Sequence, residues 1–327
     1  MIRSAAKQLM NQSPSLKAAF MLIDDFRWGR RLRSGRIDSD SGTIHNELPV
    51  AESVRYIEEV FADYKHYGKL AAFTGLAAEV GPGDNAGVAL LMRRDGCQEV
   101  HLIDRYFSRR DSNKQRKVYD ALSEKYQLGW LRTGQTWNDQ TLAGIVPKIG
   151  QAAEKYFEEY AASDGPRYDV IVSRSVLEHL YDPIGALDHM VRCLKPRGRL
   201  LHKIDMRDHA LFTPEHHELT FLKFPRRLYW LMTRHSGRPN RILFHRYREQ
   251  LERLKKQAGI DYSAYITRLV GVGELTPHLL YQDVPAALWQ QAAQSVDRYR
   301  SGFAREFKQI ESADLAITGV FVVLTKS

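Results

Sequence analysis

A carboxylate, two glycines and a second acid have the spacing of a nucleotide-binding turn. The segment Glu79-Val-Gly81-Pro-Gly83 follows a short apolar run, and Asp104 ends the next one, about 20 residues further on. Glycine is needed where the backbone bends sharply or approaches a ligand closely, and the helix expected after the turn offers unpaired N–H groups. An acid at Asp104 can accept hydrogen bonds from both ribose hydroxyls of an adenosine cofactor.

The same glycines also fit a nicotinamide dinucleotide, because Gly81-x-Gly83-x-x-Ala86 matches that fingerprint. The carboxylate of Glu79 argues against this alternative, since it stands just before the glycines and would repel a pyrophosphate. A cofactor that carries an ammonium group would be attracted instead. The turn therefore favours an adenosine cofactor with an amino-acid moiety.

Histidines and acids that could act as bases follow two of the later expected strands. His179 comes after one strand, and the run Asp205-Met-Arg-Asp-His209 leaves the next. An Asp and a His this close could pair so that the carboxylate orients the imidazole as a general base. His179, Asp205 and His209 are therefore the catalytic candidates. Arg207 could bind an anionic group of a substrate. The alternatives are a histidine that only caps or packs its turn and a charged, solvated turn at 205–209.

Apolar runs alternate with helical patterns through most of the chain. The expected strands are short and bounded by glycine or polar turns, and they cover 76–80, 100–103, 145–149, 168–173, 200–204 and 316–324. The expected helices cover 53–67, 85–94, 112–126, 151–160 and 182–194. Strands that alternate with helices imply an α/β protein with a mostly parallel sheet, helices on both faces and a ligand at the carboxyl ends of the strands.

Three segments follow one another in the order of a known family. They are the 79–83 turn with Asp104, the run Tyr168-Asp-Val-Ile-Val-Ser-Arg-Ser-Val-Leu-Glu-His-Leu-Tyr-Asp-Pro183, and Leu194-Lys-Pro-Arg-Gly198. Over residues 70–205 the chain resembles the class I S-adenosylmethionine-dependent methyltransferases, which have similar "VLEH…DP" and "LKPGG" segments. The broader chain is also similar to stand-alone methyltransferases that accompany glycosyltransferases in bacterial surface-polysaccharide pathways.

The resemblance implies a Rossmann-like, seven-stranded sheet whose last strand is antiparallel, and S-adenosyl-L-methionine as the cofactor. By that resemblance, the methionine end of the cofactor contacts Glu79, Gly81 and Gly83, and the ribose contacts Asp104. The adenine contacts Ala153 with Gln151 or Ala152, and the reacting sulfonium lies next to Ser173 and Arg174. Pro82 and Arg105 are the other expected cofactor-binding residues. Asn85 departs from the family where a third glycine is common, although asparagine tolerates unusual backbone angles. Ala152 stands where many relatives have an acid that bonds the adenine amine, so Gln151 is the expected substitute.

Glu178 and His179 raise the question of a metal ion. Some ubiquinone-pathway O-methyltransferases of this superfamily hold a divalent ion on a Glu-x-x-Glu-His run, but here Ser175 replaces the first glutamate. One carboxylate and one imidazole are too few ligands for a dedicated ion site. We therefore expect no metal.

Charge and cysteine content limit the partners. The 327 residues include 48 Lys and Arg against 39 Asp and Glu, and the net charge of +9 favours anionic partners at long range. The basic residues are scattered without a separate RNA-binding module, so no specific nucleic acid is expected. Two distant cysteines support neither disulfides nor a zinc site, and no apolar run approaches the ~20 residues of a membrane helix. These features predict a cytoplasmic protein and leave its oligomeric state open.

Two segments fall outside the methyltransferase pattern. Residues 1–50 are expected to form a helical, basic extension, and residues 51–327 the catalytic domain. The apolar residues with helical spacing in the extension are Leu16, Phe20, Ile23 and Phe26. The extension is either a peripheral helix with a solvated tail or a basic amphipathic segment that touches an acidic membrane face or a partner. Residues 206–265, rich in aromatic and basic residues, are expected to form a helical cap over the strand ends or an extra layer far from the site.

The expected reaction is methyl transfer to a hydroxyl of a small-molecule or glycan-type acceptor. An aromatic, basic cap could stack a ring and hold an anionic group. The alternatives are an RNA methyltransferase, which the positive charge suggests, and a non-catalytic protein that binds S-adenosylmethionine without turnover. A nicotinamide oxidoreductase is a more distant alternative.

Overall fold

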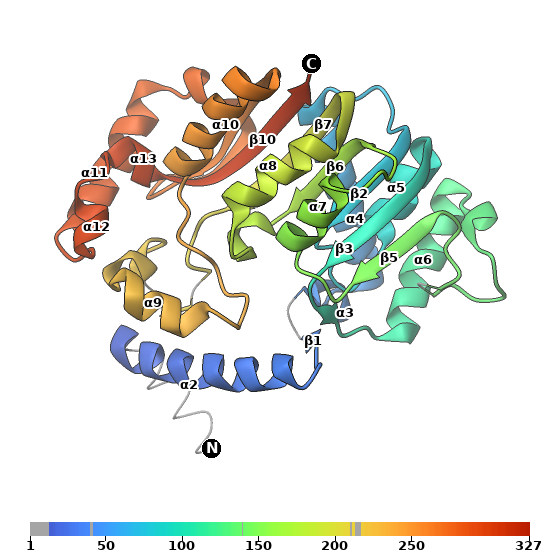
Figure 1. The fold of residues 1–327 in the computed structure, drawn as a ribbon, viewed down its shortest axis with the longest axis horizontal. Helices are drawn as coiled ribbons and strands as arrows, with labels where there is room; N and C mark the ends of the chain where they lie inside the picture. The colour runs from blue at the N-terminus through green and yellow to red at the C-terminus, as the bar shows by residue number, and fades with distance from the viewer. Residues whose placement is uncertain (1–12, 40–41, 139, 210, 213–216) are drawn as a thin grey trace.

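The computed structural model describes residues 13–39, 42–138, 140–209, 211–212 and 217–327, and one large sheet forms its centre (Figure 1). In order across the sheet the strands are β5 (Ile145–Ile149), β3 (Cys97–Asp104), β2 (Gly75–Val80), β6 (Tyr168–Arg174), β7 (Leu194–Asp205), β10 (Ile317–Lys326), β8 (Ile260–Leu269) and β9 (Gly273–Leu280). The first five strands are parallel, whereas β10 is antiparallel to both β7 and β8, and β9 is antiparallel to β8. The carboxyl ends of the parallel strands therefore meet at one edge, where the predicted site residues lie.

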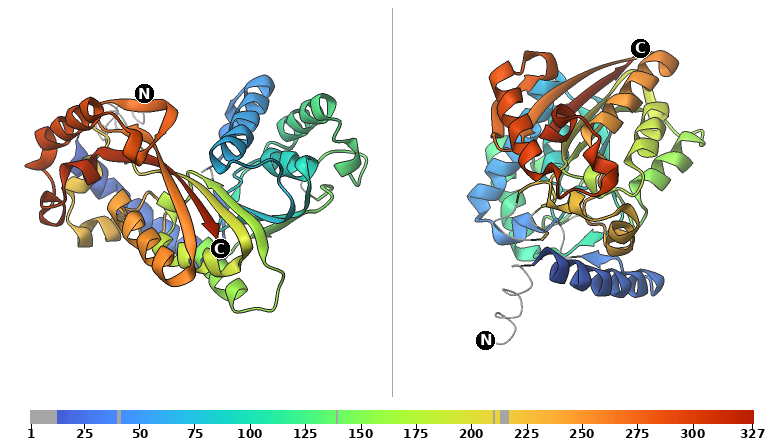
Figure 2. Two further views of the ribbon diagram at one scale, coloured as in Figure 1. Left: turned by 90° about the horizontal axis from the view of Figure 1, so that it is seen from above. Right: turned by 90° about the vertical axis from the view of Figure 1, so that its left-hand side faces the viewer.

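Helices cover both faces of this sheet (Figure 2). One face packs against α4 (Val50–Gly68), α5 (Gly87–Asp95) and α6 (Ser112–Tyr126), and the other against α7 (Ala153–Ala161), α8 (Pro183–Cys193) and α10 (Phe244–Ala258). Successive strand residues point to opposite faces, so Ala77 belongs to the first core and Ala78 to the second. A parallel sheet buried on both faces needs such nearly continuous apolar strands.

The Rossmann-like fold expected from the sequence is confirmed, including the antiparallel last strand and the strand at 145–149. The strand count differs: the large sheet has eight strands among the described residues instead of seven, because β9 adds a hairpin partner to β8 at the sheet edge. The helix expected from residue 85 begins at Gly87, since the turn continues through Asn85. Asp182 caps α8 as expected, and its carboxylate accepts a hydrogen bond of 2.9 Å from the Gly185 N–H.

The segment expected to form a cap, 206–265, divides into two parts. Its first part contains the short helices η3 (Thr220–Lys223) and α9 (Arg226–Thr233) and lies toward the carboxyl ends of the strands. Its second part is α10, which packs on the sheet face against α8, β8 and β10, followed by the first six residues of β8. The helices α11 (Ala286–Arg300), α12 (Arg305–Lys308) and α13 (Ser312–Ala316) lead from β9 to β10. Two further short 3-10 helices are η1 (Gly129–Leu131) and η4 (Tyr281–Asp283).

The N-terminal helix α2 (Pro14–Arg33) lies along α9, below the strand ends in Figure 1. Its buried residues include Met21 and Asp25, whereas Leu16, Ile23 and Phe26 are 49%, 56% and 58% exposed. The apolar stripe seen in the sequence thus faces outward. Contact of this face with a membrane or a partner stays a prediction. Residues 1–12 of the expected extension lie outside the described residues.

Short elements connect the N-terminal segment to the part of the chain that forms the large sheet. After α2, the strand β1 (Asp38–Ser39) pairs in parallel with β4 (Phe107–Ser108), and the single turn α3 (Ile44–Glu47) precedes α4. This path carries Gly42 to the glycine turn that follows β2, where its carbonyl accepts a hydrogen bond of 2.9 Å from the Asp84 N–H. In the described part of the chain, no helix has both the length and the apolar character needed to cross a bilayer.

Candidate active site

A pocket lies at the carboxyl ends of β2, β3 and β6, where most of the predicted cofactor residues were expected. The turns after these strands form its floor, the first residues of α7 form one side, and parts of the N-terminal segment and the cap close it. The residues that line it are Gly42, Val80, Gly81, Gly83, Ile103, Asp104, Arg105, Tyr106, Ser108, Ala152, Ala153, Glu154, Ser175, Val176, His179, Leu180, Tyr181, Ser236 and Gly237. We call it the cofactor pocket below.

The glycine turn is shaped by its neighbours in the fold. Gly81 and Gly83 have φ angles of 70° and 66°, in the left-handed region that side chains rarely adopt. A Cβ atom on Gly81 would collide with the Val176 side chain, and one on Gly83 would lie 2.6 Å from the Gly42 carbonyl oxygen. Both glycines therefore let other backbone segments approach the turn, in addition to lining the pocket. Pro82, between them, is half-buried and does not line it.

Glu79 lies behind the glycine turn and not on the pocket wall. It is only 6% exposed, and its Oε2 atom has no hydrogen-bond partner among the described residues. Burial raises the pKa of this carboxyl to about 8. A buried carboxylate oxygen without a donor suits the approach of a cationic group, so contact with the methionine end of a cofactor stays a prediction for Glu79.

Asp104 ends β3 and lines the pocket as predicted. Its Oδ1 accepts a hydrogen bond of 3.0 Å from the Tyr106 N–H, and each carboxylate oxygen can accept more than one hydrogen bond. Burial raises the pKa of Asp104 to about 6. The next residue, Arg105, also lines the pocket and lies over the Tyr181 ring at 4.5 Å, so these two side chains form one rim of the pocket.

The adenine side of the pocket contains a residue that the sequence did not reveal. Ala152 and Ala153 line the pocket, but the side chain of Gln151 donates to Glu159 at 2.6 Å and does not line it. Glu154 lines it instead. Its Oε1 accepts a hydrogen bond of 3.2 Å from the Tyr181 N–H, and its buried Oε2 has no partner among the described residues. The acid that appeared to be missing at position 152 is thus available two residues later.

At the end of β6, the residue that lines the cofactor pocket is one or two positions later in the sequence than expected. Ser173 is fully buried within the sheet, where its hydroxyl hydrogen-bonds with His202 Nδ1 at 2.7 Å. The Arg174 side chain does not face the cofactor pocket. It forms an ion pair with Asp63 at 2.7 Å and lines a separate polar cavity. Ser175, with a φ of 54°, lines both that cavity and the cofactor pocket. Neither Ser173 nor Arg174 lies on the cofactor pocket wall.

His179 lines the cofactor pocket at the end of the turn η2 (Leu177–His179). Its Nδ1 lies 2.8 Å from the Gly237 carbonyl oxygen, so Nδ1 carries the proton and Nε2 keeps its lone pair. Burial, together with nearby His209, lowers the pKa of His179 to about 4. The imidazole is therefore neutral throughout the physiological range, and its tautomer is fixed by a backbone atom.

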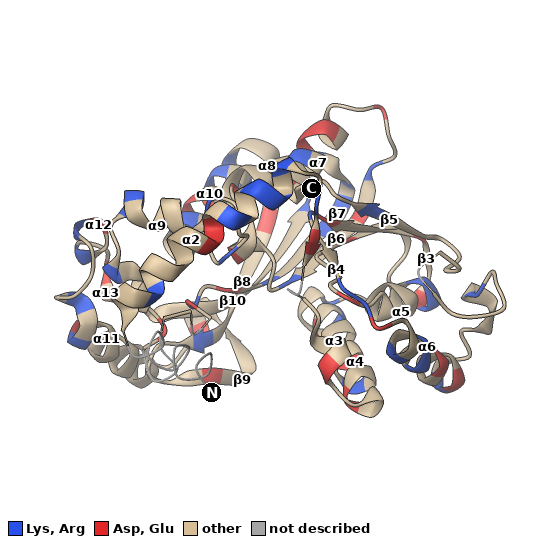
Figure 3. Cartoon of the chain, turned by 90° about the horizontal axis from the view of Figure 1, so that it is seen from below, with Lys and Arg blue, Asp and Glu red and all other residues tan. Residues whose placement is uncertain are grey.

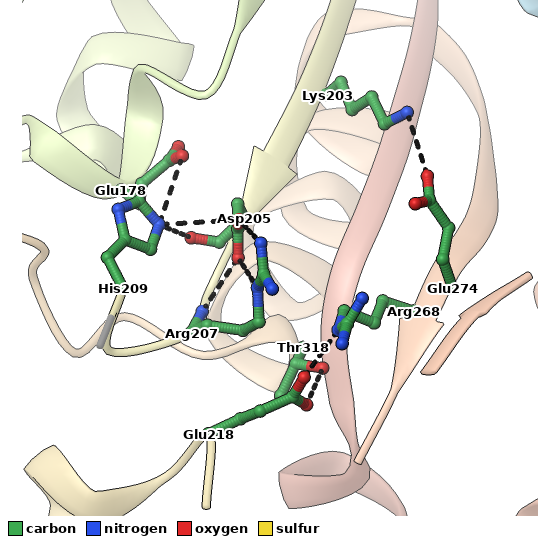
Figure 4. A network of polar contacts seen from close by, with 9 residues as sticks. All are labelled: Glu178, Lys203, Asp205, Arg207, His209, Glu218, Arg268, Glu274 and Thr318. Carbon is green, nitrogen blue, oxygen red and sulfur yellow. Dashed lines mark hydrogen bonds and ion pairs between the residues drawn. The ribbon is translucent and has the colours of Figure 1, made fainter. Parts of the chain in front are cut away.

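His209 lies close to His179 at the carboxyl ends of the strands, and the centroids of the two rings are 5.2 Å apart. Its Nε2 lies 3.5 Å from Asp205 Oδ2 and 4.0 Å from Glu178 Oε1, as Figure 4 shows. The expected pairing of Asp205 with His209 is therefore present in the geometry. Arg207 is held by the same carboxylate, because its Nε donates to Asp205 Oδ1 at 2.8 Å and its Nη2 to Oδ2 at 2.5 Å. None of these three residues lines the cofactor pocket.

Glu178 completes this cluster as a buried acid. It is 1% exposed, neither of its carboxyl oxygens has a hydrogen-bond partner among the described residues, and burial raises its pKa well above the usual range. The fold brings His209 to Glu178 and His179, so three ligand-type side chains lie together where the sequence showed two. The absence of a metal ion from this cluster stays a prediction.

The family follows from a comparison of the whole sequence. The family model described as "Methyltransferase domain" matches residues 78–264, which is more than half of the chain. The chain belongs to this family. It is a class I S-adenosylmethionine-dependent methyltransferase, as the resemblance of its motifs indicated. No curated protein matches the sequence.

Solved structures similar to this methyltransferase differ widely in what they methylate. One is the plantazolicin methyltransferase BamL, solved with S-adenosylhomocysteine; it is 11% identical, with a TM-score of 0.42 and coverage of 98% of both chains. Another is phosphoethanolamine N-methyltransferase 2 from Haemonchus contortus, solved with S-adenosyl-L-methionine. It is 16% identical, with a TM-score of 0.38 and coverage of 82% of this chain and 51% of the other. These likenesses concern the fold alone.

The cofactor of this methyltransferase is S-adenosyl-L-methionine, and the residues of the cofactor pocket fit it. Asp104 presents an acceptor oxygen to the pocket, and the partnerless oxygen of Glu154 lies on the wall beside Ala153. The glycine turn exposes backbone without side chains, and Glu79, whose Oε2 has no partner among the described residues, lies behind it. Acidic groups at both ends of a pocket suit a ligand that is rich in donors and carries no phosphate.

Proposed function

We propose that this methyltransferase methylates a hydroxyl of a small-molecule or glycan-type acceptor, with His179 as the base. The observation that carries this proposal is the fixed tautomer of His179, whose Nδ1–H is held by the Gly237 carbonyl while its ring lines the cofactor pocket. A hydroxyl must lose its proton when it takes a methyl group, and a neutral imidazole in hydrogen-bond reach can accept it.

The neighbours of His179 support this role electrostatically. Bound S-adenosylmethionine supplies a methyl group on a sulfonium, and its departing thioether is neutral, so the site needs a base but no acid. A proton gained by His179 would be stabilised by Asp205, which also holds His209 nearby. Burial lowers the proton affinity of His179 in the empty site, and positioning against the acceptor compensates for this weak basicity.

We further propose how the chain holds its cofactor. Asp104 accepts hydrogen bonds from the ribose hydroxyls, and Glu154 accepts one from the adenine amine. The backbone at Gly81 and Gly83 lies against the methionine end. The pKa of Glu79 behind the turn is raised to about 8 in the empty site, and the ammonium group of the cofactor would favour its ionised form. Arg105 and Tyr181 close the rim, and Ser236 with Gly237 covers the pocket from the cap. The cover is fixed by Asp25 of α2, which accepts hydrogen bonds from the N–H groups of His235 and Ser236.

Glu154→Leu tests the adenine contact. We expect wild-type protein to bind S-adenosylhomocysteine about 10-fold or more tightly than its inosine analogue, because the analogue lacks the amine that Glu154 accepts from. The variant should bind both compounds with nearly equal affinity in isothermal titration calorimetry. Glu158→Leu, on the outer side of the same helix, is the matched control and should keep the preference. Equal preference in wild type and Glu154→Leu would rule out this contact.

The atom that accepts the methyl group can be identified with an isotope-labelled cofactor. The full chain is incubated with S-adenosylmethionine carrying a ¹³C methyl group and a pool of hydroxyl and amine acceptors, and the products are examined by NMR. We expect the label at chemical shifts of methyl ethers. Label on nitrogen, or on added RNA, would contradict the proposal, and tight cofactor binding without any labelled product would indicate a non-catalytic binding protein. A place beside glycosyltransferases and an acceptor of the glycan type are parts of the same proposal.

A further inference from the structure

A second cavity adjoins the cofactor pocket on the cap side. It encloses about 480 Å³ between α9, α10 and α12, a size typical of small-molecule sites. His179, Leu180 and Tyr181 line both cavities, so the two adjoin at the candidate base, with these residues as their common wall. Five arginines line its walls: Arg226, Arg234, Arg238, Arg241 and Arg246. We call it the arginine groove. Figure 3 shows the basic positions of α2, α9, α10 and α12 on this side of the molecule.

Two of these arginines have structural partners. Arg238 pairs with Asp24 of α2 at 2.6 Å, and Arg246 pairs with Glu249 one turn further along α10 at 3.3 Å. The first pair anchors α2 against the cap, and the second is a surface pair within one helix. Because each of these two guanidiniums already has an acidic partner, neither is assigned to ligand binding.

The other three arginines are not neutralised within the described residues. Arg226 and Arg241 have no carboxylate within 4.0 Å there, and Arg234 reaches only Asp25, at 3.9 Å, a residue already bound to His235 at 2.8 Å. Among the described lining residues Glu306 is the single acid. Its Oε1 accepts the backbone N–H of Arg226, and its charge also acts on Arg241 without contact within 4.0 Å. The described walls therefore carry an excess of positive charge.

Arg241 is the most informative of the three because it is held in place without an acid. It lies between the rings of Tyr229 and Phe307 at 4.4 and 4.8 Å and donates to the backbone carbonyls of Phe221 and Phe224. Burial lowers its pKa to about 10. The Nε atom of Arg234 is likewise buried with no hydrogen-bond partner, and its guanidinium lies 4.9 Å above the Trp230 ring. A guanidinium that is partly withdrawn from water with no acid in contact is costly unless an anion joins it.

We propose that the arginine groove binds a phosphoryl group of the methyl acceptor while the reacting hydroxyl of that acceptor lies at His179. The planar forks of several guanidiniums match the oxygens of a phosphoryl group, which accepts several hydrogen bonds at once. The shared wall at His179 places the two ends of one acceptor in the two cavities. This inference rests on the proposed function, because it assigns the class of acceptor to the same site.

Inorganic pyrophosphate is the probe that tests the groove. Its binding to the full chain is measured by isothermal titration calorimetry, for wild type, Arg226→Gln and Arg234→Gln. We expect saturable binding to wild type and a loss of affinity of 10-fold or more in each variant. Arg227→Gln is the matched control, since this exposed neighbour on α9 does not line the groove, and it should bind as wild type does.

Two further titrations distinguish the possible failures. Succinate in place of pyrophosphate should bind at least 10-fold more weakly, and equal binding would overturn the phosphoryl assignment in favour of a carboxylate. S-adenosylhomocysteine should bind all three variants as it binds wild type, which shows that the fold and the cofactor pocket are intact. The proposal is overturned if pyrophosphate shows no saturable binding, or if Arg227→Gln weakens it as much as Arg226→Gln. If wild-type protein did not bind S-adenosylhomocysteine at all, that result would instead contradict the proposed function.

Discussion

Asp104→Asn should weaken the binding of S-adenosylhomocysteine about 30-fold or more in isothermal titration calorimetry. The substitution replaces a buried carboxylate on the pocket wall by an amide of the same size, so the shape of the pocket is kept. A hydrogen bond to a charged acceptor contributes about 1.5–3 kcal/mol, and the ribose offers two hydroxyls to this carboxylate. Asp120→Asn, on the exposed side of α6, is the control and should leave the affinity unchanged.

The pH dependence of the same titration should identify Asp104. Burial raises the pKa of Asp104 to about 6 in the empty site, and the ionised form is the better acceptor. Wild-type affinity should therefore fall as the pH drops through about 6, where the carboxylate becomes protonated. Asp104→Asn cannot titrate, so this loss of affinity at low pH should be absent. A wild-type affinity that stays constant from pH 7 to 5 would contradict the assignment.

His179→Gln should lower methyl transfer about 100-fold or more while S-adenosylhomocysteine binds as before. The glutamine keeps a donor for the Gly237 carbonyl but cannot accept a proton, and general-base catalysis typically contributes 10²–10⁴-fold. The measurement is the single-turnover rate with the acceptor identified by ¹³C labelling. His189→Gln, on α8 and away from both cavities, should be unaffected. A rate within threefold of wild type would mean that His179 only packs and caps its turn.

The local parts of the cofactor pocket could be predicted from the sequence. Strands, turns and helices depend on neighbouring residues, so Gly81, Gly83 and Asp104 were found by their spacing, and Ala153 was implied by the family resemblance. The structure places all four on the pocket wall. The same logic located the five parallel strands. These signals are short-range, because each depends on periodicity and turn chemistry over a few residues.

Side-chain direction at the strand ends was harder to predict. Ser173 lies within the sheet against His202, and Ser175, whose φ is positive, takes its place at the pocket. Two residues this far apart share one face of a regular strand, but the positive φ of Ser175 breaks the alternation, and the sequence at the end of β6 does not reveal where regular strand geometry stops. Glu154 was missed for a related reason, since the family pattern places the acid at the position of Ala152.

Contacts between distant segments had no signal in the sequence. The orientation of α2 is set by Asp25, which is buried against His235 and two backbone N–H groups of the cap, so the apolar stripe of Leu16 and Ile23 points outward. Likewise, Gly42 reaches the glycine turn only through the folded N-terminal segment. The arginine groove also combines cap residues that are scattered in sequence.

A crystal structure with bound S-adenosylhomocysteine tests the central claim most directly. We predict the ribose hydroxyls within hydrogen-bond distance of Asp104, the adenine amine at Glu154, and the sulfur facing the side of the pocket that carries Ser175 and His179. A nucleoside bound elsewhere, or one in this pocket with its ribose turned away from Asp104, would contradict the account.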